Sequence, residues 1–168
     1  MIFDKYLDRK GNYLVLFLIL LTGTVLRLFD ISQIQYTYDE ISALNRTQFD
    51  SLGELIEKGV KTDFHPLGIQ VFLFYYTKLF GYNEIVVKLP FILAGIASIF
   101  LTWHIARRWF NDHVALLSAA VRASIQYTVM YSQIARSYSF FLRVLLLLVH
   151  FYTRFFIEKE YTWKKTIS

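Results

Sequence analysis

The chain has 168 residues, of which 55% are hydrophobic and only 18% are charged, and its net charge is +5. A soluble domain of this composition would have too few polar side chains to cover its surface, so we expect an integral membrane protein. Lys and Arg stand at the ends of apolar runs and form no continuous stripe, which argues against nucleic-acid binding. The chain contains no cysteine, which excludes disulfides and thiolate metal sites.

Apolar segments in the sequence predict about four membrane spans, because a crossing takes roughly 20 residues. The segments are residues 13–29, 86–106, 114–130 and 139–157. We therefore expect an all-α, polytopic transmembrane fold in which residues 1–168 form a single membrane domain. The first segment follows a basic region, as a signal peptide would, but no small-residue cleavage site follows it, and this favours an uncleaved span.

Residues 30–85 form a long polar connection between the first two spans, and two short helices are expected in it. Ser51, Glu54 and spaced apolar residues predict an amphipathic helix that ends at Gly59 or the following lysine. Residues 67–80 are apolar and aromatic but shorter than a typical crossing, so they form either a short span or a helix on the membrane surface.

Charge decides between these alternatives, because short cytoplasmic loops collect Lys and Arg. The basic clusters are Lys5/Arg9/Lys10, Arg107/Arg108 and Lys159/Lys164/Lys165. If all three are cytoplasmic, segments 67–80 and 86–106 cannot both cross. The second is longer, so 67–80 is assigned to the surface. The N-terminus is then cytoplasmic, and residues 30–85 lie outside together with the loop around residues 131–138.

Asp39 and Glu40 are the first candidates for chemistry, because they follow the first span closely. A carboxylate there can accept a proton from a hydroxyl or bind a divalent cation. The alternative is structural, with Asp39 capping a helix from Glu40 through Asn45. His65 has a similar choice: it is a metal ligand or phosphate contact, or a solvated residue before a helix that starts at Pro66.

Three arginines in the second half are further candidates. Arg136, in the loop 131–138, can hold a phosphate by paired hydrogen bonds, or it can simply extend to the membrane interface. Arg122 and Arg143 fall inside apolar runs, where a charge costs about 2.5 kcal/mol or more. Both should therefore face other helices, water or lipid phosphate.

Taken in order, the motifs resemble a known family. They are Asp39-Glu40, Asp63-Phe-His65-Pro66-Leu, Phe80-Gly-Tyr-Asn-Glu84, Val87-Lys-Leu-Pro90, Ala106-Arg-Arg-Trp-Phe110 and Tyr131-Ser-Gln-Ile-Ala-Arg136-Ser-Tyr138. The ordered set is similar to the bacterial GT-C glycosyltransferases related to protein O-mannosyltransferases and to the lipid A aminoarabinose transferase.

The resemblance implies inverting transfer of a sugar from a polyprenyl-phosphate donor to an extracytoplasmic protein, lipid or glycan, at the bacterial inner membrane. Asp39 and Glu40 would be catalytic, with Asp39 activating the acceptor. A divalent metal ion is a possible cofactor, with Asp39 and His65 as its candidate ligands. The residues implied in binding the donor or its phosphate are His65, Tyr131, Gln133, Arg136 and Tyr138.

The chain departs from the family pattern in two ways. Ile134 stands where many relatives carry a Glu, and the chain is shorter than family members. It therefore resembles the N-terminal portion of a larger enzyme and is expected to be inactive alone. The alternative is a non-catalytic membrane subunit or remnant that binds a partner, other helices or lipid through its acidic loop. A small transporter would explain Arg122 and Arg143, but no internal repeat supports it.

Overall fold

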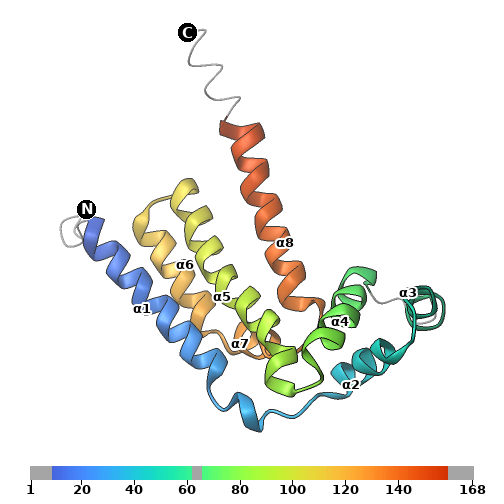
Figure 1. The fold of residues 1–168 in the computed structure, drawn as a ribbon. Helices are drawn as coiled ribbons and strands as arrows, with labels where there is room; N and C mark the ends of the chain where they lie inside the picture. The colour runs from blue at the N-terminus through green and yellow to red at the C-terminus, as the bar shows by residue number, and fades with distance from the viewer. Residues whose placement is uncertain (1–8, 62–65, 159–168) are drawn as a thin grey trace.

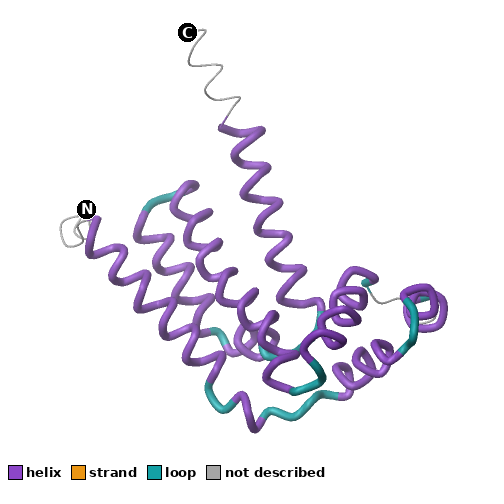
Figure 2. Tube along the Cα trace, viewed as in Figure 1, coloured by secondary structure: helices purple, strands orange, loops and turns teal. Residues whose placement is uncertain are grey.

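The computed structural model describes residues 9–61 and 66–158, which fold into helices with no strand among them (Figure 1). The all-α prediction is therefore confirmed. The elements are α1 Arg9–Leu28, η2 Ile31–Gln33, α2 Tyr38–Asn45, η3 Arg46–Gln48, α3 Leu52–Glu54, η4 Leu55–Val60, α4 Leu67–Phe80, α5 Glu84–Trp109, α6 Asp112–Ser124, α7 Gln126–Ser132, α8 Ser137–Tyr152 and η5 Thr153–Glu158. Loops between them are short (Figure 2).

Three of the helices are long and apolar enough to cross a membrane, within Lys10–Gln33, Glu84–Trp109 and Ser137–Phe156. Figure 1 shows α1, α5 and α6 side by side, while α8 leaves this group at an angle. Large apolar side chains such as Phe17, Leu148 and Phe141 are exposed on α1 and α8. Exposed apolar surface on long helices is what lipid contact requires, and the protein is accordingly an integral membrane protein.

Small residues bring α1, α5 and α6 close together. On α6, Ala115, Ala119 and Ala123 recur every four residues and are buried against α1 and α5. On α1, a Cβ added to Gly23 would lie only 2.6 Å from Ile99 Cδ1. Close backbone approach through small residues is a common way for membrane helices to pack, because lipid gives little hydrophobic drive for association.

Polar contacts tie one end of this bundle, which we call the basic end and define by Asn12, Arg107 and Asp112. The Arg107 Nε atom lies 2.6 Å from Asp112 Oδ1, and Arg107 Nη1 donates to the Tyr13 hydroxyl at 3.1 Å. The Asn12 amide also donates to Asp112. The start of α1 and the end of α5, two of the basic clusters in the sequence, therefore lie at the same end.

The expected third span, residues 114–130, is not one helix. It is divided into α6 and α7, and Ile125 between them is extended. The carbonyls of residues 122 and 123 accept hydrogen bonds from the Arg27 guanidinium, and the Thr128 hydroxyl also donates to the residue 122 carbonyl. These side chains bond carbonyls at the end of α6, where the helix has no backbone donors of its own to offer.

At the other end of the bundle, which we call the loop end, α4 lies beside the start of α5, with α2 next to α4 and α3 farther out (Figure 1). The predicted helix at residues 67–80 is confirmed as α4. The amphipathic segment is confirmed as well: Ser51 caps α3, and the helix continues as η4 to Val60, with Lys61 after it. The core here contains Ala43, Leu44, Leu73, Val87, Phe91 and Ala135.

A proline in α5 creates a link between α4 and α5. Pro90 has no backbone N–H, so the carbonyl of Val86 lacks its usual helical donor. The Tyr76 hydroxyl of α4 donates to this carbonyl at 3.2 Å. The loop end is thus fastened to α5 at the point where the helix itself leaves an acceptor free.

Farther along α5, Gly95 allows the close approach of α7. A Cβ added to Gly95 would lie 2.6 Å from Ser132 Cβ and 3.2 Å from Arg27 Nε. Contacts this short do not occur between ordinary side chains, so only glycine fits at this position. The distance between α5 and α7 is therefore set by the absence of a side chain.

Candidate functional site

Glu40 joins the two polar segments that were expected to lie together. Its carboxylate is fully buried, and Oε1 accepts a hydrogen bond of 2.7 Å from the backbone N–H of Ala135. Oε2 accepts from both the backbone N–H and the hydroxyl of Thr37, at 2.9 Å each. Glu40 therefore holds the start of α2 against the loop before α8, and all of these bonds are internal.

Thr37 is the residue that begins α2. Its hydroxyl accepts from the Glu40 N–H while Glu40 accepts from the Thr37 N–H, which is a capping box. The expectation that Asp39 caps a helix starting at Glu40 is therefore wrong. The signal was present in the sequence as Thr37-Tyr-Asp-Glu40, a Ser/Thr followed three residues later by Glu.

Asp39 lies next to Glu40 but faces a different environment. The Asp39 side chain is 57% exposed, and its Oδ1 lies 3.4 Å from Arg136 Nη2. The Arg136 side chain is only 8% exposed, and its Nε is buried without a hydrogen-bond partner among the described residues. The predicted proximity of the 39–40 and 131–138 segments is thus confirmed, and it places an exposed carboxylate over a mostly buried guanidinium.

A second arginine, Arg46, lies near this pair. Burial lowers the pKa of Arg46; the Arg136 guanidinium lowers it further, and Asp39 raises it. The Arg46 guanidinium also donates to the Ser42 hydroxyl at 2.9 Å. Two guanidinium groups therefore act on the single exposed carboxylate of Asp39, which makes this part of the loop end attractive to anions.

Lys88 holds the segment that leads into α2, and sequence reasoning gave it no role beyond a place in a motif. It is fully buried in α5, and its Nζ donates to the carbonyls of Ile34 and Gln35 at 2.6 and 3.2 Å. The ammonium also lies 5.4 Å from the centre of the Tyr36 ring. The signal was a lysine inside an apolar helix, a position that requires a partner.

Tyr36 continues this connection toward the loop before α5. Its hydroxyl donates to the Tyr82 carbonyl at 3.0 Å, and the Tyr82 hydroxyl lies 3.0 Å from that of Thr47. Burial, together with the carboxylates of Glu40 and Glu84, raises the pKa of Tyr36 to about 12. The phenol therefore stays protonated at neutral pH and keeps its hydrogen bond.

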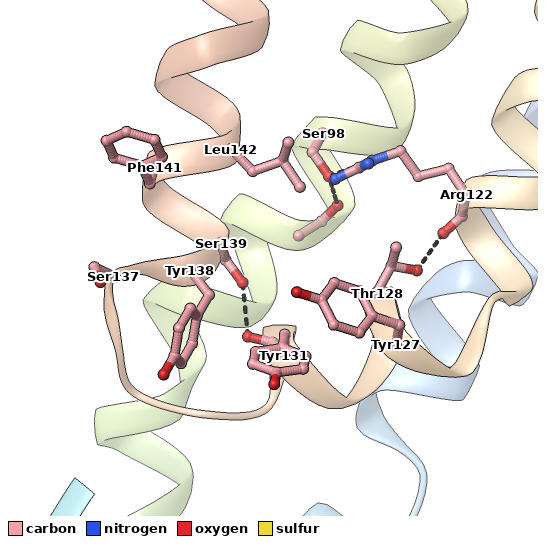
Figure 3. Close-up of a pocket in the computed structure, with 11 residues that line it drawn as sticks. Ser98, Arg122, Tyr127, Thr128, Tyr131, Ser137, Tyr138, Ser139, Phe141 and Leu142 are labelled. Carbon is pink, nitrogen blue, oxygen red and sulfur yellow. Dashed lines mark hydrogen bonds between the residues drawn. The ribbon is translucent and has the colours of Figure 1, made fainter. Parts of the chain in front are cut away.

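The other residues of the 131–138 loop that were predicted to bind the donor do not face Asp39. Gln133 is buried, and its amide donates to the Arg27 carbonyl at 3.1 Å. Tyr131 and Tyr138 pack edge to face, 4.7 Å apart, and both line a pocket of about 300 Å³ between α5 and α8 (Figure 3). Among the predicted donor-binding residues within 66–158, only Arg136 forms an ion pair with Asp39.

The predicted divalent metal site has an incomplete set of described ligands. His65 lies outside the described residues, and within 9–61 and 66–158 no three His, Asp or Glu side chains are grouped so that they could hold a metal ion. The Glu40 carboxylate, the nearest acid in sequence, is occupied by the three internal hydrogen bonds given above. A metal bound by Asp39 and His65 stays a prediction.

The fold and this site define a class: a polytopic membrane protein whose loop end places acidic and basic side chains next to the apolar helices. The family model described as dolichyl-phosphate-mannose-protein mannosyltransferase matches residues 64–167, more than half of the chain. The chain belongs to this family of membrane glycosyltransferases, and the resemblance seen in the sequence is confirmed. At the level of the family, the activity is glycosyl transfer from a polyprenyl-phosphate sugar donor.

The matched region includes Lys88, Arg122 and Arg136 but begins after Asp39 and Glu40. The acidic half of the candidate site therefore rests on the contacts of this structure and on the motif resemblance, and the basic half is also covered by the family match. No curated protein and no solved structure matches the chain.

Proposed function

We propose that the chain forms part of an inverting glycosyltransferase that moves a sugar from a polyprenyl-phosphate donor to an acceptor outside the cytoplasm. The observation that carries the proposal is the 3.4 Å contact between Asp39 and Arg136. An exposed carboxylate suits a general base, and a neighbouring guanidinium suits a phosphate.

In the proposed reaction the acceptor hydroxyl oxygen attacks the anomeric carbon from the face opposite the phosphate. The hydroxyl proton passes to Asp39, and the bond between the anomeric carbon and the phosphate oxygen breaks, leaving its electron pair on the phosphate. Arg136 stabilises the charge that develops on this leaving group. Attack from the opposite face inverts the configuration of the sugar.

Glu40 has a different part in this proposal from the catalytic role that the family resemblance implied. Its carboxylate is buried and bonded to Thr37 and Ala135, so it has no free oxygen facing an acceptor. We assign it the positioning of Asp39 against Arg136, because it fixes α2 to the loop that carries Arg136. Asp39 is then the single base of the proposal.

The test is a transfer assay with the full-length protein in membranes, using a polyprenyl-phosphate sugar. Asp39→Asn keeps the size of the side chain but removes its basicity, and we expect turnover to fall by about 10² or more. Asp50→Asn is the matched control, because Asp50 is an exposed acid of the same loop, and it should leave turnover unchanged. Normal turnover of Asp39→Asn would exclude Asp39 as the base.

The proposal also requires the loop end to face away from the cytoplasm, with the N-terminus cytoplasmic at a bacterial inner membrane. Single cysteines can be placed at Gln48 in the loop end and at Phe110 near the basic end, both exposed residues. An impermeant thiol reagent added to whole cells should label the first and spare the second. The reverse pattern would put the site on the cytoplasmic side and remove an extracytoplasmic acceptor.

A non-catalytic membrane subunit is the second candidate, and one observation favours it. Asp39 and Arg136 already satisfy each other's charge, as a purely structural pair would. A subunit would show no dependence of transfer on Asp39, while its association with a partner protein would be sensitive to the same substitution. Co-purification of the Asp39→Asn chain with its partner, measured beside the transfer assay, separates the two functions.

A further inference from the structure

Outside the Asp39–Arg136 pair, a second charged group occupies the pocket shown in Figure 3. This pocket of about 300 Å³ lies between α5, α6, α7 and α8, and Arg122 enters it from α6. The Arg122 Nε donates to the Ser98 hydroxyl at 3.1 Å, and this hydroxyl donates in turn to the Gly95 carbonyl at 2.6 Å. The guanidinium is thereby held in a fixed position by a single protein acceptor.

The rest of the Arg122 guanidinium is not used by the protein. Across residues 9–61 and 66–158, Arg122 pairs with no carboxylate, and its side chain makes no hydrogen bond besides the one to Ser98. Nearby Arg27, by contrast, donates to the carbonyls of residues 23 and 123. A cation inside an apolar helix bundle is unfavourable without an anion, so the free N–H groups of Arg122 indicate that one binds here.

The start of α8 adds a second positive feature to the same pocket. Ser137, Tyr138 and Ser139 form its first turn and line the pocket. This turn contains no acidic residue, and no side chain caps it. The N-terminus of a helix carries partial positive charge and unbonded N–H groups, which favour an anion at this position.

The walls of the pocket are apolar and aromatic, and they reach the surface of the bundle. Tyr127 is 63% exposed and Phe141 is 72% exposed, and Leu142 lies between Phe141 and the Arg122 guanidinium (Figure 3). A small hydrated anion would gain nothing from such walls. A lipid would place its charged head at Arg122 and its apolar chains along the exposed aromatic residues.

We propose that the Arg122 pocket binds the phosphate head group of a membrane lipid. The site is separate from the Arg136 contact, since Arg136 is not among the residues that line this pocket. It does not depend on the proposed transferase reaction, because it would be present equally in a non-catalytic subunit. The shared chemistry is a phosphate on an apolar tail, which either a phospholipid or an isoprenoid phosphate supplies.

Native mass spectrometry of the full chain in detergent tests this directly. The probes are dioleoyl phosphatidylglycerol, undecaprenyl phosphate, dioleoylglycerol and inorganic phosphate. We expect at least one of the two lipid phosphates to bind at least about 10-fold more tightly than dioleoylglycerol, and Arg122→Gln to remove this difference. Arg143→Gln is the matched control, because Arg143 lies within α8 and is not among the pocket residues. The affinity of this variant for the lipid phosphates should stay within about two-fold of the wild-type value.

Leu142→Trp is a second variant, and it keeps the test valid if Arg122→Gln fails to fold. It fills the pocket while leaving Arg122 intact, and it should weaken lipid binding by about 10-fold as well. Wild-type affinity in both variants would overturn the proposal. Equal binding of dioleoylglycerol would show an apolar groove with no phosphate site, and binding of inorganic phosphate without either lipid would show a free-anion site. Preference for one lipid phosphate over the other identifies the source.

Discussion

The junction between the bundle and the loop end, and the surface above this junction, use charged side chains in different ways. At the junction, Arg27, Glu40 and Lys88 are fully buried, and each bonds to at least one backbone group of another segment. Above it, Asp39 pairs with the mostly buried Arg136, and the Asp39 carboxylate is open to solvent.

The difference separates structural charges from charges that are available for chemistry. Bonds to carbonyls and N–H groups satisfy a buried charge and at the same time fix two backbone segments together. They leave no capacity for a substrate. Asp39 is adjacent to Glu40 in sequence, yet only Asp39 keeps an exposed oxygen. Of these two neighbouring acids, Glu40 therefore has a structural role and Asp39 is available for chemistry.

The largest effect that would test this comparison is expected at Glu40. Glu40→Gln replaces one acceptor oxygen by an amide that cannot accept from the Thr37 N–H, so a buried donor loses its partner. We expect the free energy of unfolding in detergent to fall by about 3 kcal/mol. Asp39→Asn, the matched change at the exposed acid, should lower it by about 1 kcal/mol or less, because the Asp39 carboxylate is open to solvent. Equal losses would erase the distinction.

An intermediate effect is expected at Arg27. Arg27→Met removes the hydrogen bonds to carbonyls at the end of α6, and we expect a loss of about 2 kcal/mol in the free energy of unfolding. Arg143→Met is the control, because Arg143 has no hydrogen bond or ion pair with any described residue. Its stability should match the wild type or exceed it. A larger loss for Arg143→Met than for Arg27→Met would contradict the assignment.

The smallest effect concerns pH and the Tyr36 phenol. The pKa of Tyr36 is raised from 10.0 in the unfolded chain to about 12 in the folded protein. Because the unfolded chain ionises first as pH rises, this contribution is fully present below pH 10 and is lost between pH 10 and about 12. The melting temperature of the wild type should therefore fall more steeply over that interval than that of Tyr36→Phe. Parallel curves would show that Tyr36 does not titrate as described.

Local features were readable from the sequence. The bounds of α4 follow from Pro66 at its start and Gly81 after its end, and α5 contains the whole of the predicted 86–106 span. The meeting of Asp39 with the 131–138 loop followed from charge parity, which needs only a count of crossings. These results depend on short-range chemistry or on topology, and both are visible in a single sequence.

The division of the 114–130 segment into α6 and α7 could not be predicted from the sequence. No proline or glycine interrupts it, and the break depends on Arg27, which is distant in sequence and bonds to the carbonyls of residues 122 and 123. The different surroundings of Gln133 and Arg136 are also tertiary, since one side chain bonds to α1 and the other to Asp39. The sequence therefore predicted that the 131–138 loop lies near Asp39, but it did not predict which of the loop's side chains face Asp39.

Gly95 has a consequence for any site at the loop end, although it lies in the middle of α5. Its missing methyl group sets how near α7 can come, and α7 leads directly into the loop that carries Arg136. Adding a single carbon at position 95 would push that loop outward and lengthen the gap to Asp39. The distance between Asp39 and Arg136 therefore depends on a glycine that belongs to neither of their segments.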